Sequence, residues 1–140
     1  MQEERYGKKH YLLFINSKLK PKNMTPAAKS VYYFGFYLYL VGATLIFIPN
    51  IFLSTLGIPE TNEVWIRVLG IIVLLLGFYY HQTGAKNIHA FFPLTIPTRI
   101  IVFTSFLVLV ILKMASPMMV GIGAIDLAGA IWTFMALKKK

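Results

Sequence analysis

The chain has 140 residues, of which 57% are hydrophobic and 14% are charged, and its formal net charge is +9. A soluble domain has about a quarter of its residues charged, so this composition predicts an integral membrane protein and excludes a disordered chain or an ordinary soluble enzyme. The chain has no cysteine, which excludes disulfide scaffolds, thiol redox chemistry, iron–sulfur clusters and thiolate zinc sites.

The basic residues gather at the two ends of the chain. Basic residues beside apolar segments orient membrane proteins and attract anionic lipids, so no nucleic-acid partner is expected. Within the N-terminal group, Lys8, Lys9, Lys18, Lys20 and Lys22 are the candidate contacts to anionic lipid or to a partner protein. The complete set at the two ends is Arg5, Lys8, Lys9, Lys18, Lys20, Lys22, Lys29, Lys138, Lys139 and Lys140.

The first apolar segment follows a basic tail that we expect to occupy residues 1–30. No charged residue lies between Lys29 and Glu60, and about 20 apolar residues suffice to cross a bilayer as a helix. A first transmembrane helix is therefore predicted over residues 27–49.

Both ends of this first helix carry recognisable signals. Thr25 is the expected N-cap and Pro26 the first helical residue, because proline fits the first turn, where its missing N–H costs nothing. Residues 51–56 are expected to lie along the membrane interface before a turn at residues 57–59.

The second transmembrane helix is predicted over residues 63–81. Thr61 or Asn62 is its expected N-cap, and Glu63 lies in the first turn, where the helix dipole favours a negative charge. Residues 82–97 contain two prolines and several polar residues, so a loop on the membrane surface is expected there.

The third transmembrane helix is predicted over residues 97–115, with Arg99 and Lys113 just inside its ends. Long basic side chains at such positions extend outward to the lipid head groups. We therefore expect both side chains to leave the apolar core.

The fourth helix is predicted over residues 117–137, directly after Ser116, and a lysine tail follows at residues 138–140. Because almost no loop separates it from the third helix, the two should be antiparallel neighbours. The predicted fold class is all-α: an integral membrane, up-down-up-down four-helix bundle formed by residues 31–137.

The orientation of this bundle follows from counting basic residues. With both termini in the cytoplasm, twelve basic residues lie inside, including Lys86 and Arg99, whereas only Arg67 and Lys113 lie outside. This bias predicts a multi-pass protein of the bacterial cytoplasmic membrane with cytoplasmic termini.

Small residues recur at intervals of seven in three of the predicted helices. This spacing keeps them on one helix face and favours a left-handed bundle with helix crossings of about +20°. The fourth helix has the most small residues and is expected to be the most enclosed. Close packing is the first interpretation, and glycines that line a substrate path are the alternative. The repeating residues are Gly35 and Gly42, then Gly70, Gly77 and Gly84, then Gly121 and Ala128.

Asp126 is the one acid near the middle of a predicted span. An unpaired carboxylate near the bilayer centre costs about 2.5–3.5 kcal/mol, so Asp126 should face the bundle interior and be partnered or protonated. Arg67 is expected to extend toward it, with Glu63 as its competing partner on the same helix. The hydroxyl groups of Ser105 and Tyr39 lie at a similar depth and are the further candidates.

Two interpretations of Asp126 stay open. The carboxyl group is either the centre of a proton- or cation-coupled site or a polar contact that fixes one helix arrangement. No nucleophile motif, phosphate-binding loop or metal-ligand spacing occurs in the sequence, and only His81 of the three histidines lies near a span. We therefore expect no catalytic residue, no metal and no cofactor.

Several short motifs in residues 31–137 resemble a group of small bacterial four-helix membrane proteins that are broadly similar to the DoxX-like group. The resemblance implies four spans in a bacterial cytoplasmic membrane, and DoxX-type proteins are associated with quinone-linked redox complexes. Small multidrug transporters also have four spans, but their essential acid lies in the first helix. The motifs are Pro49-Asn50, Leu56-Gly57-Ile58-Pro59, Glu63-Val64-Trp65-Ile66-Arg67, Gly77-Phe78-Tyr79-Tyr80 and Asp126-Leu127-Ala128-Gly129-Ala130-Ile131-Trp132-Thr133.

The function expected from the sequence is that of a non-catalytic accessory or structural subunit of a larger bacterial membrane complex. A small proton-coupled transporter centred on Asp126 is the first alternative. A DoxX-like redox accessory protein is the second.

Overall fold

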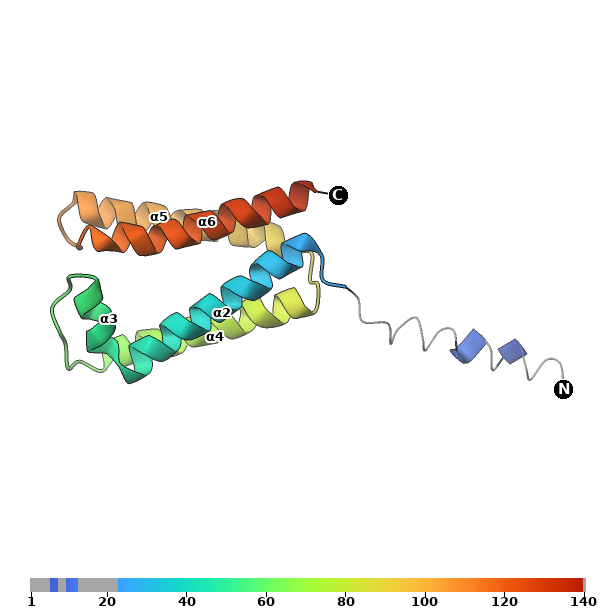
Figure 1. The fold of residues 1–140 in the computed structure, drawn as a ribbon, viewed down its shortest axis with the longest axis horizontal. Helices are drawn as coiled ribbons and strands as arrows, with labels where there is room; N and C mark the ends of the chain where they lie inside the picture. The colour runs from blue at the N-terminus through green and yellow to red at the C-terminus, as the bar shows by residue number, and fades with distance from the viewer. Residues whose placement is uncertain (1–5, 8–9, 13–22, 140) are drawn as a thin grey trace.

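The computed structural model describes residues 6–7, 10–12 and 23–139, and these residues form helices and no strands. Four of the helices are long and apolar enough to cross a membrane, and Figure 1 shows them side by side. The predicted all-α class is confirmed. The helices are α2 (Pro26–Phe47), the short α3 (Pro49–Thr55), α4 (Trp65–Ala85), α5 (Phe92–Ile111) and α6 (Met118–Lys138).

The start of α2 is the one predicted from the sequence. The Thr25 side chain accepts a hydrogen bond from the Ala28 N–H at 3.2 Å, and Pro26 is the first helical residue. The helix ends before Ile48, which has a φ of −136°. Pro49 explains this end, because proline disfavours helical geometry in the residue before it and itself begins α3.

The beginning of α4 differs from the prediction. The helix begins at Trp65, and neither Thr61 nor Asn62 caps it. The Thr61 hydroxyl instead accepts a hydrogen bond from the Glu63 N–H at 3.1 Å, within the connection that precedes the helix. The helix also continues to Ala85, beyond the predicted end at residue 81.

The largest difference lies in residues 82–97, which were predicted to form a surface loop. Most of this segment is helical, since α5 begins at Phe92 and contains both prolines of the segment. Pro93 lies in the first turn, where its missing N–H has no helical partner in any case. Arg99 consequently lies about two turns inside α5.

The short connection between α4 and α5 is fixed by Asn87, which has a φ of +53°. Its side-chain oxygen accepts hydrogen bonds from the Thr25 N–H and from the Thr25 hydroxyl, each at 3.1 Å. Its amide group donates to the Asn23 carbonyl at 3.2 Å. These contacts join the start of α2 to the turn that follows α4.

Glycines set the distance and register between α2 and α4. A Cβ atom on Gly42 would lie 2.8 Å from the Gly70 carbonyl oxygen, and one on Gly77 would lie 3.1 Å from the Gly35 carbonyl oxygen. A Cβ on Gly84 would lie 2.8 Å from the carbonyl oxygen of Ala28. The facing pairs show that α2 and α4 are antiparallel and pack backbone to backbone, which confirms the packing interpretation for these two helices.

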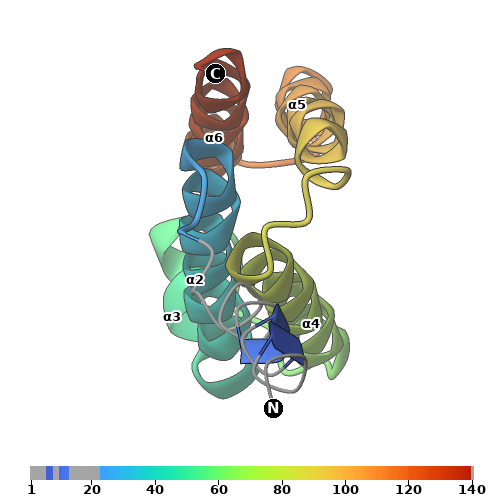
Figure 2. The ribbon, with the colours of Figure 1, turned by 90° about the vertical axis from the view of Figure 1, so that its right-hand side faces the viewer.

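The same interpretation is wrong for α6. A Cβ on Gly121 would meet nothing within 4 Å, and Ala128 is exposed. The most enclosed helix is α2, whereas only Gly123, Ala130, Thr133 and Ala136 are buried in α6. Figure 2 gives the reason, because α2 lies between α4 and α6 while α5 packs mainly on α6.

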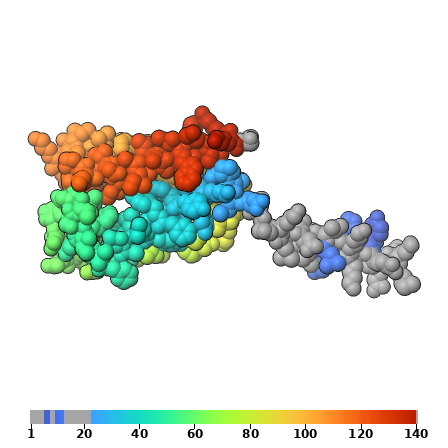
Figure 3. All heavy atoms as spheres, in the orientation of Figure 1, coloured from blue at the N-terminus to red at the C-terminus, as the bar shows by residue number. Residues whose placement is uncertain are grey.

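The short helix α3 and the turn that follows it lie at the end of the bundle opposite the connection between α4 and α5. Gly57 has a φ of +65°, a conformation that glycine adopts without strain. Its Cα faces the Ser116 side chain, since an added Cβ would lie 3.3 Å from the Ser116 hydroxyl oxygen. In Figure 3 the atoms of this region lie against the turn between α5 and α6.

The glycine contacts predict a matched pair of substitutions. Gly42→Ala places a Cβ 2.7 Å from the Leu74 backbone nitrogen, so α2 and α4 must separate and the free energy of unfolding should fall by about 1–3 kcal/mol. Gly121→Ala adds the same atom in open space within α6, and because alanine favours a helix more than glycine does, it should raise the free energy of unfolding by about 0.4–1 kcal/mol. Unfolding in mixed detergent micelles measures both, and equal effects would contradict this packing.

Candidate functional site

Arg67 does not reach Asp126, and the predicted bridge between them is wrong. The Arg67 guanidinium is exposed and donates a hydrogen bond to the Ile46 carbonyl oxygen. That carbonyl belongs to the last turn of α2, where the oxygens lack helical partners and the helix dipole attracts a cation. Arg67 therefore caps α2 at the end of the bundle.

The other predicted partners also lie elsewhere. The Tyr39 hydroxyl forms a hydrogen bond of 3.2 Å with His81 Nδ1. Ser105 is exposed on α5, and Glu63 is exposed before α4. The sequence predicts only how far along its helix each of Tyr39 and Ser105 lies, and in the structure the rotation of each helix directs both side chains away from Asp126.

The predicted lipid contacts Lys8, Lys9, Lys18, Lys20 and Lys22 lie outside the described residues. The described part of the chain contains no group of three or more side chains that could hold a metal ion.

Arg99 is the charged residue that shares the surroundings of Asp126. The prediction that its side chain extends to the lipid head groups is wrong, because only 1% of the residue is exposed. Its Cζ atom lies 3.8 Å from the centre of the Phe34 ring and 5.1 Å from that of Tyr80. Such cation–π contacts stabilise a guanidinium that has been removed from water.

A hydroxyl pair joins Arg99 to two other helices. Arg99 Nη1 donates to the Thr133 hydroxyl at 3.2 Å, and that oxygen lies 3.0 Å from the Ser30 hydroxyl oxygen. A Cβ on Gly129 would lie 2.9 Å from Arg99 Nη1, so the missing side chain leaves room for the guanidinium. The contact therefore connects α5, α6 and α2 at one buried point.

Among the described residues, none accepts a hydrogen bond of normal geometry from the opposite edge of the guanidinium. Arg99 Nε and Nη2 are buried and have no hydrogen-bond partner among the described residues. These two nitrogens form the side of the guanidinium that binds a planar pair of oxygens. Buried N–H groups of this kind are normally paired, so this edge is the least satisfied polar group of the site.

A cavity of about 350 Å³ lies beside Arg99 and Asp126. Its floor is buried, with Thr95 and Tyr80 only 2% and 5% exposed, whereas its rim residues Leu76 and Leu94 are 44% and 62% exposed. The cavity therefore begins at the buried Arg99 and the half-buried Asp126 and reaches the surface between α4 and α5. It is lined by Phe34, Leu38, Leu76, Tyr80, Phe91, Leu94, Thr95, Thr98, Arg99, Val102 and Asp126.

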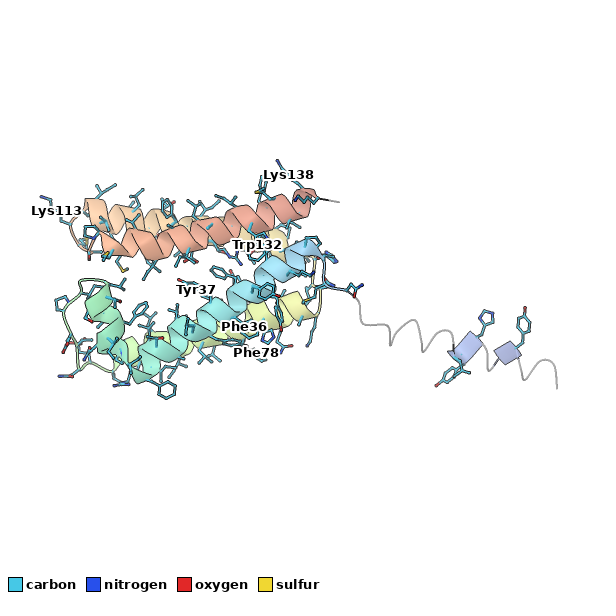
Figure 4. The ribbon with its side chains drawn as sticks, viewed as in Figure 1. Phe36, Tyr37, Phe78, Lys113, Trp132 and Lys138 are labelled. Carbon is cyan, nitrogen blue, oxygen red and sulfur yellow. The ribbon has the colours of Figure 1, made fainter. Side chains whose placement is uncertain are left out.

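Two further hollows lie along α2 and α6. Figure 4 shows Tyr37 and Trp132 where these helices face each other, and both residues line a hollow of about 270 Å³. A hollow of about 480 Å³ is formed mainly by apolar side chains of α6. Neither is lined by a buried charged side chain, so the cavity of about 350 Å³ at Arg99 is the better candidate site.

The sequence contains a signal that Arg99 lies inside a helix and not at its end. Pro93 suits the first turn of a helix, and a helix that begins there places Arg99 well inside it. No comparable signal marks Thr133 and Ser30, because hydroxyl side chains occur throughout membrane helices.

Comparisons with protein-family models, with curated proteins and with solved structures gave no match for this chain. The resemblance to the DoxX-like group stays a prediction from the sequence.

The hydroxyl contact predicts a second pair of substitutions. Thr133→Val keeps the shape of the side chain but leaves Arg99 Nη1 without its acceptor, so the free energy of unfolding should fall by about 1–2 kcal/mol. Thr104→Val removes a hydroxyl that donates to a carbonyl of its own helix and should change it by less than about 0.5 kcal/mol. Unfolding in mixed micelles compares them, and a neutral Thr133→Val would show that the contact contributes nothing.

Proposed function

We propose that the chain is a multi-pass protein of the bacterial cytoplasmic membrane, an up-down-up-down bundle with both termini in the cytoplasm. Support comes from the basic residues at the helix ends. Figure 4 shows Lys138 and Lys113 at opposite ends of the bundle. The start of α2, which contains Lys29, and the end of α4, which precedes Lys86, lie at the Lys138 end in Figure 1, whereas the start of α4, which contains Arg67, lies at the Lys113 end. Because Arg99 lies in the interior, this orientation places eleven basic residues in the cytoplasm and two, Arg67 and Lys113, outside.

Within that membrane, the proposed function is that of a non-catalytic accessory subunit of a larger complex, which binds an amphipathic molecule at the Arg99 cavity. The unpaired Nε and Nη2 edge of Arg99 supports the ligand-binding part of this proposal. A buried cation beside a mostly apolar cavity suits a ligand with one polar head and an apolar body. Exposed Leu76 and Leu94 at the rim give such a ligand a path from the lipid.

A small proton-coupled transporter centred on Asp126 is the second candidate. It is favoured by one observation: Asp126 lines the cavity beside Arg99, yet Arg99 donates no hydrogen bond to it. Ionisable groups inside a membrane frequently belong to proton or substrate pathways. A DoxX-like redox accessory role is supported only by the resemblance of the sequence motifs.

Purification from membranes in a mild detergent, followed by native mass spectrometry, tests the two candidates. The accessory-subunit proposal predicts recovery in a fixed ratio with other membrane subunits, together with a bound small molecule that is released on denaturation. Recovery as a stand-alone homodimer would contradict the subunit proposal and favour the transporter.

A further inference from the structure

We propose that the ligand of the Arg99 cavity is a long-chain carboxylic acid, held by its carboxylate on Nε and Nη2 of Arg99. This inference rests on the proposed function, in which the cavity binds an amphipathic molecule. It adds the chemical class of that molecule, which follows from the shape of the unpaired edge and of the cavity.

The head group is inferred from the part of the guanidinium that remains free. Nη1 is occupied by Thr133, and the Phe34 ring covers a face of the guanidinium at 3.8 Å. The free Nε and Nη2 carry parallel N–H groups at the spacing of two carboxylate oxygens. A carboxylate satisfies both groups in one plane, whereas an alcohol or an ester carbonyl offers a single oxygen for them.

The apolar body is inferred from the walls of the cavity. Leu38, Leu76, Phe91, Leu94 and Val102 line it, and its volume of about 350 Å³ is near the lower limit for small-molecule sites. The head group and the first part of an alkyl chain fit within such a volume. The rest of the chain passes the exposed rim and continues into the lipid.

The head group reaches Arg99 only when a neighbouring side chain moves, because Nε and Nη2 are covered in this structure. Tyr80 is the neighbour from α4, with its ring centre 5.1 Å from Arg99 Cζ, and it lines the same cavity. Binding of the head group therefore requires the Tyr80 ring to rotate. Side-chain rotation of this kind is common when ligands bind.

Asp126 opposes this ligand, because it places a second carboxylate in the same cavity. Two carboxylates with one guanidinium leave an unbalanced negative charge in apolar surroundings, which is unfavourable. Removal of the Asp126 charge should therefore strengthen the binding of a carboxylate at Arg99. The opposite response is expected from a ligand that carries a positive charge.

Equilibrium binding of radiolabelled laurate to the full chain in zwitterionic nanodiscs tests the proposal, with binding to protein-free nanodiscs subtracted. Arg99→Gln should lower the affinity at least tenfold, and Asp126→Asn should raise it severalfold. Arg67→Gln removes a basic residue that lies outside the cavity and is the matched control, which should bind as the parent chain does. Leu94→Trp narrows the rim at an exposed position, so it should lower the affinity even if Arg99→Gln fails to fold.

Competition with molecules of the same chain length identifies the head group. Unlabelled laurate should displace the label at least tenfold better than dodecanol, methyl laurate, dodecyl phosphate or a decyl benzoquinone. One of these competitors could displace the label as well as laurate does, or better, and Leu94→Trp could abolish that displacement. This result would overturn the proposal of a carboxylate head group, whereas the proposal of an amphiphile site would stand. Binding that neither Arg99→Gln nor Leu94→Trp alters would overturn both proposals.

Discussion

The close approach of α2 and α4 is the constraint on which the rest of the structure depends. Glycines that face each other every seven residues allow the two backbones to meet, and this contact fixes both the distance and the register of the helices. Phe34 directly precedes Gly35, and Tyr80 lies three residues, about one helical turn, after Gly77. Their rings are consequently held 5.5 Å apart, where together they flank the Arg99 guanidinium.

The second hairpin, formed by α5 and α6, is attached to α2 through polar groups as well as apolar ones. Arg99 from α5 and Thr133 from α6 meet Ser30 of α2. In a membrane, apolar burial alone contributes little to helix association, so hydrogen bonds and close packing decide which helices pair. Because α4 and α5 do not pack tightly on each other, the space between them becomes the cavity at Arg99.

The sequence predicted those features that depend on local chemistry. Thr25 and Pro26 mark a helix start by their own backbone and side-chain preferences, and the spacing of Gly35 and Gly42 marks a packing face. Features that depend on helix rotation were missed. Depth along the membrane placed Tyr39 and Ser105 level with Asp126, but depth does not determine which way a side chain points. Arg99 was missed for a different reason: α5 begins at Phe92, five residues before the predicted start, and this earlier start places Arg99 in the buried part of the helix, where Arg67 had been expected.

Helices α2 and α6 meet at a buried polar contact directly beside Arg99. Because the chain has no cysteine of its own, the pair Ser30→Cys and Thr133→Cys can be introduced without any background. The two hydroxyl oxygens lie 3.0 Å apart, so mild oxidation in native membranes should join the two cysteines within one chain. Failure to form this disulfide, in a protein that is otherwise folded, would contradict the contact between α2 and α6 at these two residues.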